Sequence, residues 1–229
     1  MSRPLIMIAT AVVAFTIGRL TARPAINRLR AHLTDAHRQL LHDPLTGMLN
    51  RTGLHTAHQA LAQTTPARPI IVALIDLDDF KHVNDTHGHD HGDHLLKAVG
   101  ERITDVAALH GGIAARLAGD EYAALLPAHT DDLDRIAELF TALIAQPVTL
   151  TEGGATVTVT ASVGVTLADT SDPLTDVALH RADIAMYHAK HRGRNRHATY
   201  RPGMSMPPTP HQRGHRLRDR RQPISGASA

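Results

Sequence analysis

The sequence contains no cysteine and no tryptophan, and aromatic residues make up only 3% of it. The absence of cysteine excludes a disulfide-stapled fold, a thiolate metal site and a cysteine nucleophile. The scarcity of aromatic side chains leaves the core to Val, Ile, Leu and Ala, and a hydrophobic fraction of 42% is enough to form one. With 229 residues, the chain has room for one domain of ordinary size and short appendages.

Net charge is also low, at a formal +2, but it is distributed unevenly along the chain. From Arg201 to Ala229 there are six arginines against one acid, with repeated prolines and almost nothing apolar to bury. This composition predicts a disordered basic tail over residues 201–229. Anionic lipid or nucleic acid could contact such a tail. However, it lacks interleaved aromatic side chains for base stacking, so we expect no nucleic-acid partner.

No uninterrupted hydrophobic run reaches the length of about 20 residues that a membrane-spanning helix usually has. The run from Leu5 to Leu20 comes nearest and lies close to the lower limit of about 17. Arg3 alone precedes it, whereas several arginines follow from Arg19 onward. The positive-inside rule then predicts a single N-terminal anchor in the cell membrane within residues 1–24, with the rest cytoplasmic. A cleaved signal peptide is the alternative, although no clear small-x-small site precedes the arginines.

Residues 25–42 carry apolar side chains at helical spacing, which predicts an amphipathic linker helix. Residues 43–200 then alternate between helical and extended patterns. Predicted helices cover 51–63, 91–106, 133–144 and 176–192, and predicted strands cover 70–76, 113–117, 122–126, 157–167 and 196–200. This order predicts an α/β domain of the α+β, ferredoxin-like type, with a central, mainly antiparallel sheet flanked by helices.

Acidic residues gather at two predicted strand ends. Asp76, Asp78 and Asp79 follow the apolar strand 70–76, and Asp120-Glu121 occupies the tight turn before strand 122–126. Alternation along an extended chain sends the side chains of Asp76 and Asp78 to the same side. Carboxylates crowded in this way repel one another unless a cation lies between them, and hard oxygen ligands suit Mg²⁺ and triphosphates. The alternative is that all of these are solvated loop acids.

Six blocks in this region resemble, in the same order, the motifs of the GGDEF domain family of diguanylate cyclases. They read DPLTGMLNR from Asp43, DLDDFK from Asp76, NDTHGHDHGD from Asn84, AGDEY from Ala118, SVGV from Ser162, and RAD, MY, AK and GRN between Arg181 and Asn195. Each block alone is weakly specific, whereas the ordered set is highly specific. The resemblance covers residues 43–200 and implies a GGDEF or nucleotidyl-cyclase-like fold.

The resemblance also implies an activity, the condensation of two GTP molecules into cyclic di-GMP and two pyrophosphates. Catalysis in the family takes place across a homodimer in which each subunit holds one GTP. In this sequence the implied metal ligands for Mg²⁺ (or Mn²⁺) are the carboxylates of Asp76 and Asp120 and the backbone carbonyl of Leu77. The implied catalytic residues are Asp120, Glu121 and Lys81.

Substrate binding is implied for a further set of residues. Asn84 and Asp93 would recognise the guanine edge, because an amide and a carboxylate match its acceptor and donor groups. Lys81, Lys190 and Arg194 would hold the triphosphate through charge-assisted hydrogen bonds. Phe80 and Gly119 are also assigned to the substrate site.

Three departures from the family pattern bear on activity. Ala118 replaces the first glycine of the signature, Tyr122 replaces its final phenylalanine, and Asp79 stands at a commonly apolar position. A methyl group at position 118 could crowd the nucleotide and lower the rate. Leu109 and Gly112 occupy the positions of the family's inhibitory Arg-x-x-Asp pair, so no product-inhibition site is expected.

Two other functions compete with the cyclase interpretation. The domain could be weakly active or inactive and serve as a GTP-binding or protein-interaction module. It could instead be a zinc-binding regulator built on the histidine string His87, His89, His91 and His94. Because the chain has 18 histidines, a structural or solvent-facing role is favoured for these four.

Overall fold

The computed structural model describes residues 38–63, 66–128, 133–150, 154 and 156–206, together with 7, 23, 26–29, 32, 35 and 36. Most of the predicted anchor, much of the predicted linker helix and residues 207–229 of the predicted tail therefore lie outside the described residues. In the described part of the chain, no helix is both long enough and apolar enough to cross a membrane.

The centre of the domain is a five-stranded sheet in the order β2-β3-β1-β6-β7. Its strands are β1 (Pro69–Leu77), β2 (Ile113–Ala118), β3 (Glu121–Pro127), β6 (Ala161–Asp169) and β7 (Arg196–Thr199). Every neighbouring pair is antiparallel except β6 and β7, which are parallel. The predicted α+β fold with a mainly antiparallel sheet is thus confirmed. A small hairpin of β4 (Val148–Thr149) and β5 (Thr156–Val157) stands apart from this sheet.

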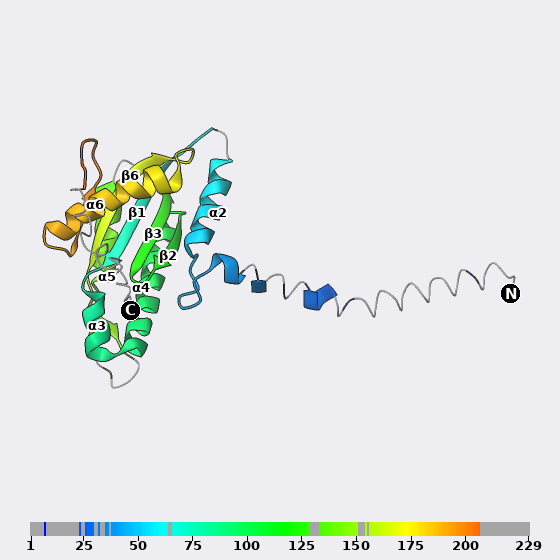
Figure 1. Cartoon of the computed structure of the whole chain (residues 1–229), viewed down its shortest axis with the longest axis horizontal. Coiled ribbons are helices and arrows are strands. Elements are labelled where there is room, and N and C mark those ends of the chain that lie inside the picture. Colours follow the sequence, from blue (N-terminus) through cyan, green and yellow to red (C-terminus); the bar gives the residue numbers. More distant parts are fainter. Residues whose placement is uncertain are drawn as a thin grey trace, which may run out of the picture.

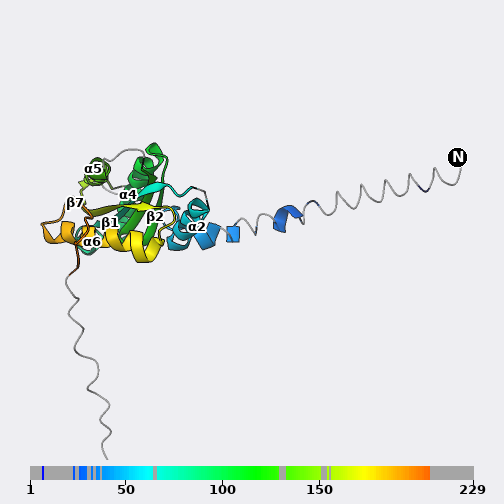
Figure 2. The same cartoon turned by 90° about the horizontal axis from the view of Figure 1, so that it is seen from above.

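Helices cover both faces of the sheet (Figures 1 and 2). One face packs against α3 (Phe80–His87), α4 (His89–Leu109) and α5 (Leu133–Ile144), and the other against α2 (Arg51–Ala62), the π-helical segment η1 (Leu174–Leu179) and α6 (His180–His191). Strand β1 is buried on both faces, because its alternate side chains enter the two separate core clusters. This accounts for its continuous apolar sequence.

Helix α3 was not predicted from the sequence. The segment directly before the predicted helix 91–106 was interpreted as a loop. Only Phe80 and Val83 of its eight residues are buried, so it is too short to show a clear periodicity. The predicted strand 157–167 also differs from the structure, because it divides into β5 and β6. The predicted helix 176–192 begins earlier, as the π-helical turn from Leu174.

Helix α6 lies directly on strand β6 at Gly164. A Cβ atom added at Gly164 would lie 2.0 Å from the carbonyl oxygen of Ala182 and 2.3 Å from the amide nitrogen of Met186. Only glycine permits this approach of two backbones. Beyond β7, residues 201–206 also contact α6, since the Nε2 atom of His188 lies 3.2 Å from the carbonyl oxygen of Ser205. The first residues of the predicted tail are therefore placed against the domain.

Candidate active site

The two acidic segments predicted from the sequence meet at one edge of the sheet. Asp76, near the end of β1, is directly opposite Glu121 at the start of β3. The backbone N–H of Leu77 donates to the carbonyl oxygen of Asp120 at 3.2 Å, which ties the turn before β3 to the end of β1. We call Asp76, Asp120 and Glu121 the acidic edge.

Negative charge is only partly balanced at the acidic edge. The ammonium group of Lys190 in α6 lies 2.8 Å from the Oδ2 atom of Asp76. Burial nevertheless raises the pKa of Asp76, and the neighbouring Asp120 and Asp78 carboxylates add to the rise that Lys190 opposes. Burial also raises the pKa of Glu121, with a further contribution from the charge of Asp76. Partly buried carboxylates with a raised pKa, close to further carboxylates, fit a site for a bound cation.

The acidic edge is not a preformed metal cage. Within the described part of the chain, no three histidine or acidic side chains converge closely enough to hold a metal ion. Its oxygen donors are nevertheless of the kind that Mg²⁺ and Mn²⁺ bind, and triphosphate oxygens commonly complete the coordination of such ions.

The turn from Ala118 to Tyr122 follows a bulge in the pairing of β2 with β3. Gly119 adopts a φ of +51°, in the left-handed region that favours glycine, and a side chain there would point into open space. Ala118 is exposed and does not have a positive φ, so the turn accepts its methyl group without backbone strain. Tyr122 is fully buried, and its hydroxyl donates to the carbonyl oxygen of Leu96 at 2.9 Å, which explains how tyrosine fits this position.

Arg116 links this turn to the opening motif, and the sequence analysis assigned it no role. Its Nε donates to the carbonyl oxygen of Gly119 at 2.8 Å, and its Nη1 lies 3.0 and 3.2 Å from the two carboxylate oxygens of Asp43. Although burial alone would raise the pKa of Asp43, hydrogen bonds from Thr46 and Arg116 hold it below its ordinary value. An arginine two residues before the signature was the only signal in the sequence.

The predicted guanine-binding residues lie on the α3–α4 unit. A Cβ atom at Gly92 would lie 1.8 Å from the Oδ1 atom of Asn84, so Gly92 makes room for the Asn84 amide. Asp93 is the next residue of α4 and is exposed. Phe80, which was assigned to the substrate site, is 8% exposed and packs in the core beneath this unit.

The three predicted triphosphate-binding side chains come from two elements and a turn. Lys81 is exposed on the first turn of α3, and Lys190 lies on α6 beside Asp76. Arg194 follows α6, and its Nη2 atom lies 3.6 Å from Oδ1 of Asp79. Asp79 has a φ of 52°, a conformation that aspartate adopts more readily than branched apolar residues do.

Asp78, which the sequence grouped with the cation site, has a different environment. Its side chain is 8% exposed and accepts hydrogen bonds from the hydroxyls of Thr160 and Ser162, each at 2.7 Å, and from the backbone N–H of Asn195 at 2.9 Å. These bonds engage both carboxylate oxygens. Asp78 is thus a structural carboxylate, in contrast to its neighbour Asp76.

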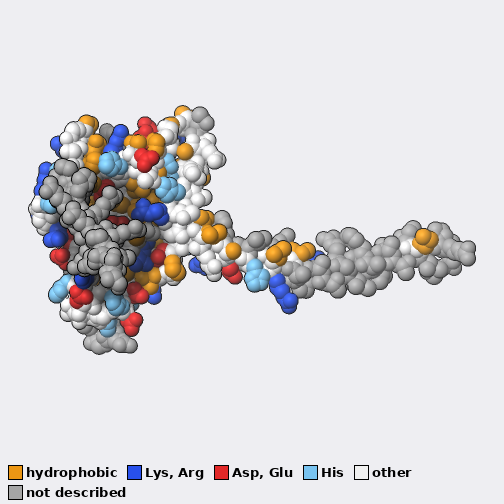
Figure 3. All heavy atoms as spheres, viewed as in Figure 1, with side chains coloured by type: hydrophobic (Ala, Val, Ile, Leu, Met, Phe, Trp, Pro, Cys, Tyr) orange, Lys and Arg blue, Asp and Glu red, His pale blue; other side chains and the backbone are white. Residues whose placement is uncertain are grey.

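The histidine string does not gather into one site. His87 ends α3, and His89, His91 and His94 lie on the first turns of α4. The Nδ1 atom of His91 lies 2.7 Å from the backbone carbonyl oxygen of His87. Figure 3 shows histidine side chains dispersed over the visible face of the domain.

The positions that correspond to the family's inhibitory pair are the last residue of α4, Leu109, and Gly112 in the turn before β2. Leu109 is 81% exposed, and a Cβ atom at Gly112 would lie 2.4 Å from the carbonyl oxygen of Leu125. Position 112 therefore has no room for a side chain as the backbone stands.

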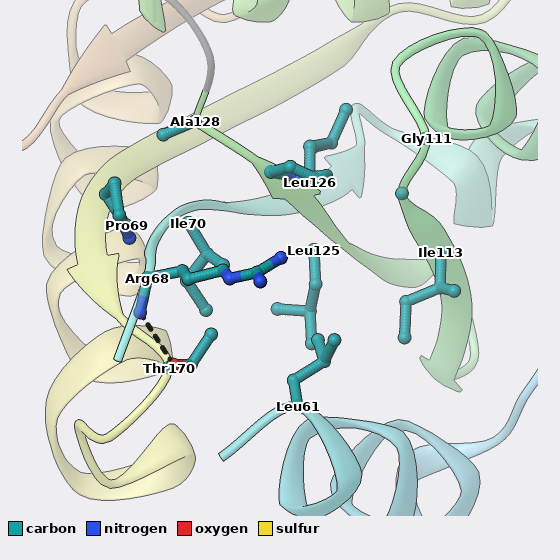
Figure 4. A pocket seen from close by; sticks show the side chains of 12 residues that line it. Leu61, Arg68, Pro69, Ile70, Gly111, Ile113, Leu125, Leu126, Ala128 and Thr170 are labelled. Carbon is teal, nitrogen blue, oxygen red and sulfur yellow. Dashed lines mark hydrogen bonds between the residues drawn. The ribbon is translucent and has the colours of Figure 1, made fainter. Parts of the chain in front are cut away.

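An apolar pocket of about 400 Å³ lies near this loop, at the end of β1 and β3 opposite to the acidic edge (Figure 4). The side chain of Arg68 reaches across it, and the backbone N–H of Arg68 donates to Thr170 Oγ1 at 3.0 Å. None of the predicted site residues lines this pocket. We assign the chemistry to the acidic edge, because the clustered ionisable groups lie there.

Comparison with known families identifies the domain. The family model described as diguanylate cyclase, GGDEF domain, matches residues 40–196. The chain belongs to the GGDEF domain family. The resemblance inferred from the six sequence blocks is thereby confirmed.

Individual relatives include enzymes of cyclic di-GMP metabolism. The chain is 36% identical to the bifunctional diguanylate cyclase/cyclic di-GMP phosphodiesterase MucR of Pseudomonas aeruginosa, over 87% of this chain and 30% of MucR. It is 33% identical to the diguanylate cyclase DgcN of Escherichia coli, over 72% of this chain and 40% of DgcN. The chain thus spans less than half the length of either relative.

A solved structure is similar over most of the described fold. The coiled coil and GGDEF domain of DgcB from Caulobacter crescentus, in complex with c-di-GMP, superimposes with a TM-score of 0.71 at 27% identity. The match covers 80% of this chain and 98% of that one.

Proposed function

We propose that this chain is a diguanylate cyclase, which condenses two GTP molecules into cyclic di-GMP and two pyrophosphates. The observation that carries the proposal is the acidic edge, where Asp76, Asp120 and Glu121 meet beside Lys190 on a GGDEF fold. Under-compensated carboxylates next to a lysine suit the binding of a metal–triphosphate complex.

In this proposal, Asp76, Asp120 and the backbone carbonyl of Leu77 hold Mg²⁺ (or Mn²⁺). When bound, the ion neutralises the negative charge that the phosphates carry and develop during the reaction. Lys190, whose ammonium lies 2.8 Å from Asp76, would add positive charge beside the bound triphosphate. Lys81 and Arg194 supply further positive charge to the phosphate oxygens.

Glu121, with Asp120 as the other candidate, accepts the proton of the attacking 3′-hydroxyl. The O3′ atom of one GTP forms a bond to the α-phosphorus of the other, and the bond from that phosphorus to the bridging oxygen breaks, so that pyrophosphate leaves. A second, equivalent step closes the ring. The raised pKa of Glu121 makes its carboxylate a better proton acceptor than a solvated glutamate.

Selection of guanine is assigned to Asn84 and Asp93. The amide of Asn84 offers both a donor and an acceptor, and the carboxylate of Asp93 accepts from N–H groups of the base. Gly92 leaves room for the Asn84 amide beside the start of α4. Adenine presents a different pattern of donors and acceptors, so this pair should discriminate against ATP.

We further propose that the active species is a homodimer attached to the membrane by residues 1–24. Two GTP molecules must face each other, which one acidic edge cannot achieve alone. Ile26, Leu29 and Leu40 precede the domain, are exposed and recur at helical spacing, which supports pairing of two linker helices. Deletion of residues 1–24 should transfer the protein from the membrane fraction to the soluble fraction.

The test is incubation of the purified full-length protein with GTP and Mg²⁺, followed by mass spectrometry of the products. We expect cyclic di-GMP and pyrophosphate in a ratio of one to two. Formation of a guanine product other than cyclic di-GMP and its linear dinucleotide intermediate would contradict the proposal. Binding of GTP without turnover would support the interaction-module alternative, and stoichiometric zinc by elemental analysis would support the zinc-regulator alternative.

A further inference from the structure

The end of β1 is joined to the turn that follows α6 by a single buried carboxylate. Asp78 accepts the backbone N–H of Asn195 at 2.9 Å, across 117 residues of sequence. The same Oδ2 atom accepts from Thr160, and Oδ1 accepts from Ser162 on β6. In return, the N–H of Asp78 donates to the carbonyl oxygen of Thr160 at 2.8 Å. One side chain therefore holds three separate segments together.

The turn that Asp78 holds has a costly backbone conformation. Gly193, Arg194 and Asn195 have φ values of 116°, 58° and 47°. Across the described residues, only three that are not glycine have a positive φ, and the third is Asp79, next to Asp78. Residues kept in this region persist where the surrounding structure over-determines them. A charge-assisted hydrogen bond from the Asn195 N–H to a buried carboxylate is a restraint of that kind.

One basic side chain lies on this turn, and another lies on the helix directly before it. Arg194 belongs to the turn, and its guanidinium meets Asp79 at 3.6 Å across the junction. Lys190 lies on the last turn of α6, directly before it, with its ammonium 2.8 Å from Asp76. Strand β7 begins immediately afterward and pairs with β6 from Ser162 onward. The 193–195 turn thus places the Arg194 guanidinium beside Asp79, whereas the position of Lys190 is set by helix α6, which packs on β6 at Gly164.

We propose that Asp78 is a positioning residue for triphosphate binding: it holds the 193–195 turn and thereby keeps the Arg194 guanidinium beside Asp79, just after the end of β1. The claim that the turn serves triphosphate binding rests on the proposed function. The claim that Asp78 holds the turn does not. If the role of Asp78 were purely structural, loss of its side chain would only lower the stability of the whole domain. The positioning role also predicts a specific loss of triphosphate affinity that depends on Arg194.

The experiment compares Asp78→Ala and Asp78→Asn with the wild type in the full-length protein. Asp172→Ala is the matched control, because the Asp172 side chain also accepts a backbone N–H, that of Asp169, at 3.1 Å. This contact belongs to a different turn from residues 193–195. Two quantities are measured at a temperature where all forms are folded. The first is hydrogen–deuterium exchange of peptides covering residues 193–199, and the second is the Kd of a GTP analogue with a methylene group between the α- and β-phosphates.

For Asp78→Ala we expect faster exchange in residues 193–199 and a Kd about tenfold higher, the size expected for the loss of one charged contact. Asp78→Asn retains an acceptor for the Asn195 N–H and should show a smaller effect on both. Asp172→Ala should change neither. In a double-mutant cycle, Asp78→Ala should add little to the loss caused by Arg194→Ala.

Unchanged exchange in Asp78→Ala would overturn the inference, and so would an effect on Kd that adds fully to that of Arg194→Ala. If Asp78→Ala does not fold, the same two criteria apply to Asp78→Asn. A wild-type protein that binds no GTP analogue would instead contradict the proposed function. The exchange measurement would then still decide whether Asp78 holds the turn.

Discussion

Asp76 and Asp78 are two residues apart at the end of the same strand, yet their surroundings are opposite. Asp76 has Lys190 as an ionic partner, lies near two other carboxylates and has a raised pKa. Asp78 is more deeply buried and accepts three hydrogen bonds from hydroxyl and backbone donors. The negative charge at Asp76 is only partly balanced, whereas both carboxylate oxygens of Asp78 accept hydrogen bonds within the fold.

This difference separates a ligand site from a structural site within one short motif. A buried carboxylate is stable when donors surround it, and costly when other carboxylates do. A fold that keeps the costly arrangement at Asp76, Asp120 and Glu121 leaves room for a ligand that supplies positive charge. Five sets of substitutions test the properties of this edge of the sheet.

The largest effect is expected at the acidic edge itself. Asp76→Asn and Asp120→Asn each remove a carboxylate assigned to the metal–triphosphate complex, so each should lower the rate of cyclic di-GMP formation by about 100-fold or more. The fold should persist, because neither side chain holds the sheet together. Steady-state rates and circular dichroism provide the measurement, with exposed Asp105→Asn as the control. A variant with near wild-type turnover would remove that residue from the mechanism.

The second change removes one of the hydrogen-bond donors of Asp78. Ser162→Ala leaves the buried Oδ1 atom of Asp78 without its 2.7 Å donor and should lower the free energy of unfolding by about 2 kcal/mol. For a domain of this size, the melting temperature would fall by about 4–8 °C. Thr166→Val, on the same strand, removes a hydroxyl that does not contact Asp78 and should cost clearly less. Equal losses in the two variants would show that Asp78 has no special need for its donors.

The third change concerns the guanine-binding unit. In Gly92→Ala the new methyl group would lie 1.8 Å from Oδ1 of Asn84, and the flexible amide can turn aside at little cost to the fold. We therefore expect KM for GTP to rise about tenfold, roughly the value of one specific hydrogen bond, with a smaller change in kcat. In an Asn84→Ala background the substitution should have almost no further effect. A large loss of stability instead would mean that the amide cannot move.

The fourth change is at Ala118, the departure from the family signature. The turn accepts this alanine, and the residue is exposed next to the acidic Asp120-Glu121 pair. If the methyl group crowds the transition state, Ala118→Gly should raise kcat/KM for GTP by about five- to tenfold, from a clash of about 1 kcal/mol. The comparison is made at matched protein concentration. Unchanged or lower activity would show that Ala118 does not restrict the site.

The smallest effect is a stability change in Glu121→Gln. Burial and the charge of Asp76 raise the pKa of Glu121, so the folded protein binds a proton more tightly than the unfolded chain does. Wild-type stability should therefore fall as pH rises through the range just above the ordinary value of 4.5. The glutamine variant lacks this loss and should melt at a higher temperature than the wild type at neutral pH, with a smaller difference at pH 4. Melting curves at pH 4 and pH 7.5 measure it, and a variant less stable at neutral pH would contradict the pKa assignment.

Much of this protein could be predicted from its sequence. The ordered motifs indicated the family, and the alternation of apolar residues indicated most of the helices and strands. Tight turns at Asp120-Glu121 and at the end of strand 70–76 were visible because acids interrupted apolar runs. Short or irregular elements were missed, namely helix α3, the π-helical turn η1 and the break before β6. Their patterns span too few residues for periodicity to be decisive.

By itself, the sequence determined which residue types are available for the chemistry and the order of the elements, because both follow from local pattern and composition. The tertiary structure alone decided that Asp76 is under-compensated while Asp78 is satisfied, since the donors of Asp78 come from residues 160, 162 and 195. It also decided the roles of Arg116, Gly92 and Gly164, whose partners lie elsewhere in the chain. Hydrogen bonds and close contacts between distant segments depend on how the chain packs, and spacing along the sequence does not encode them.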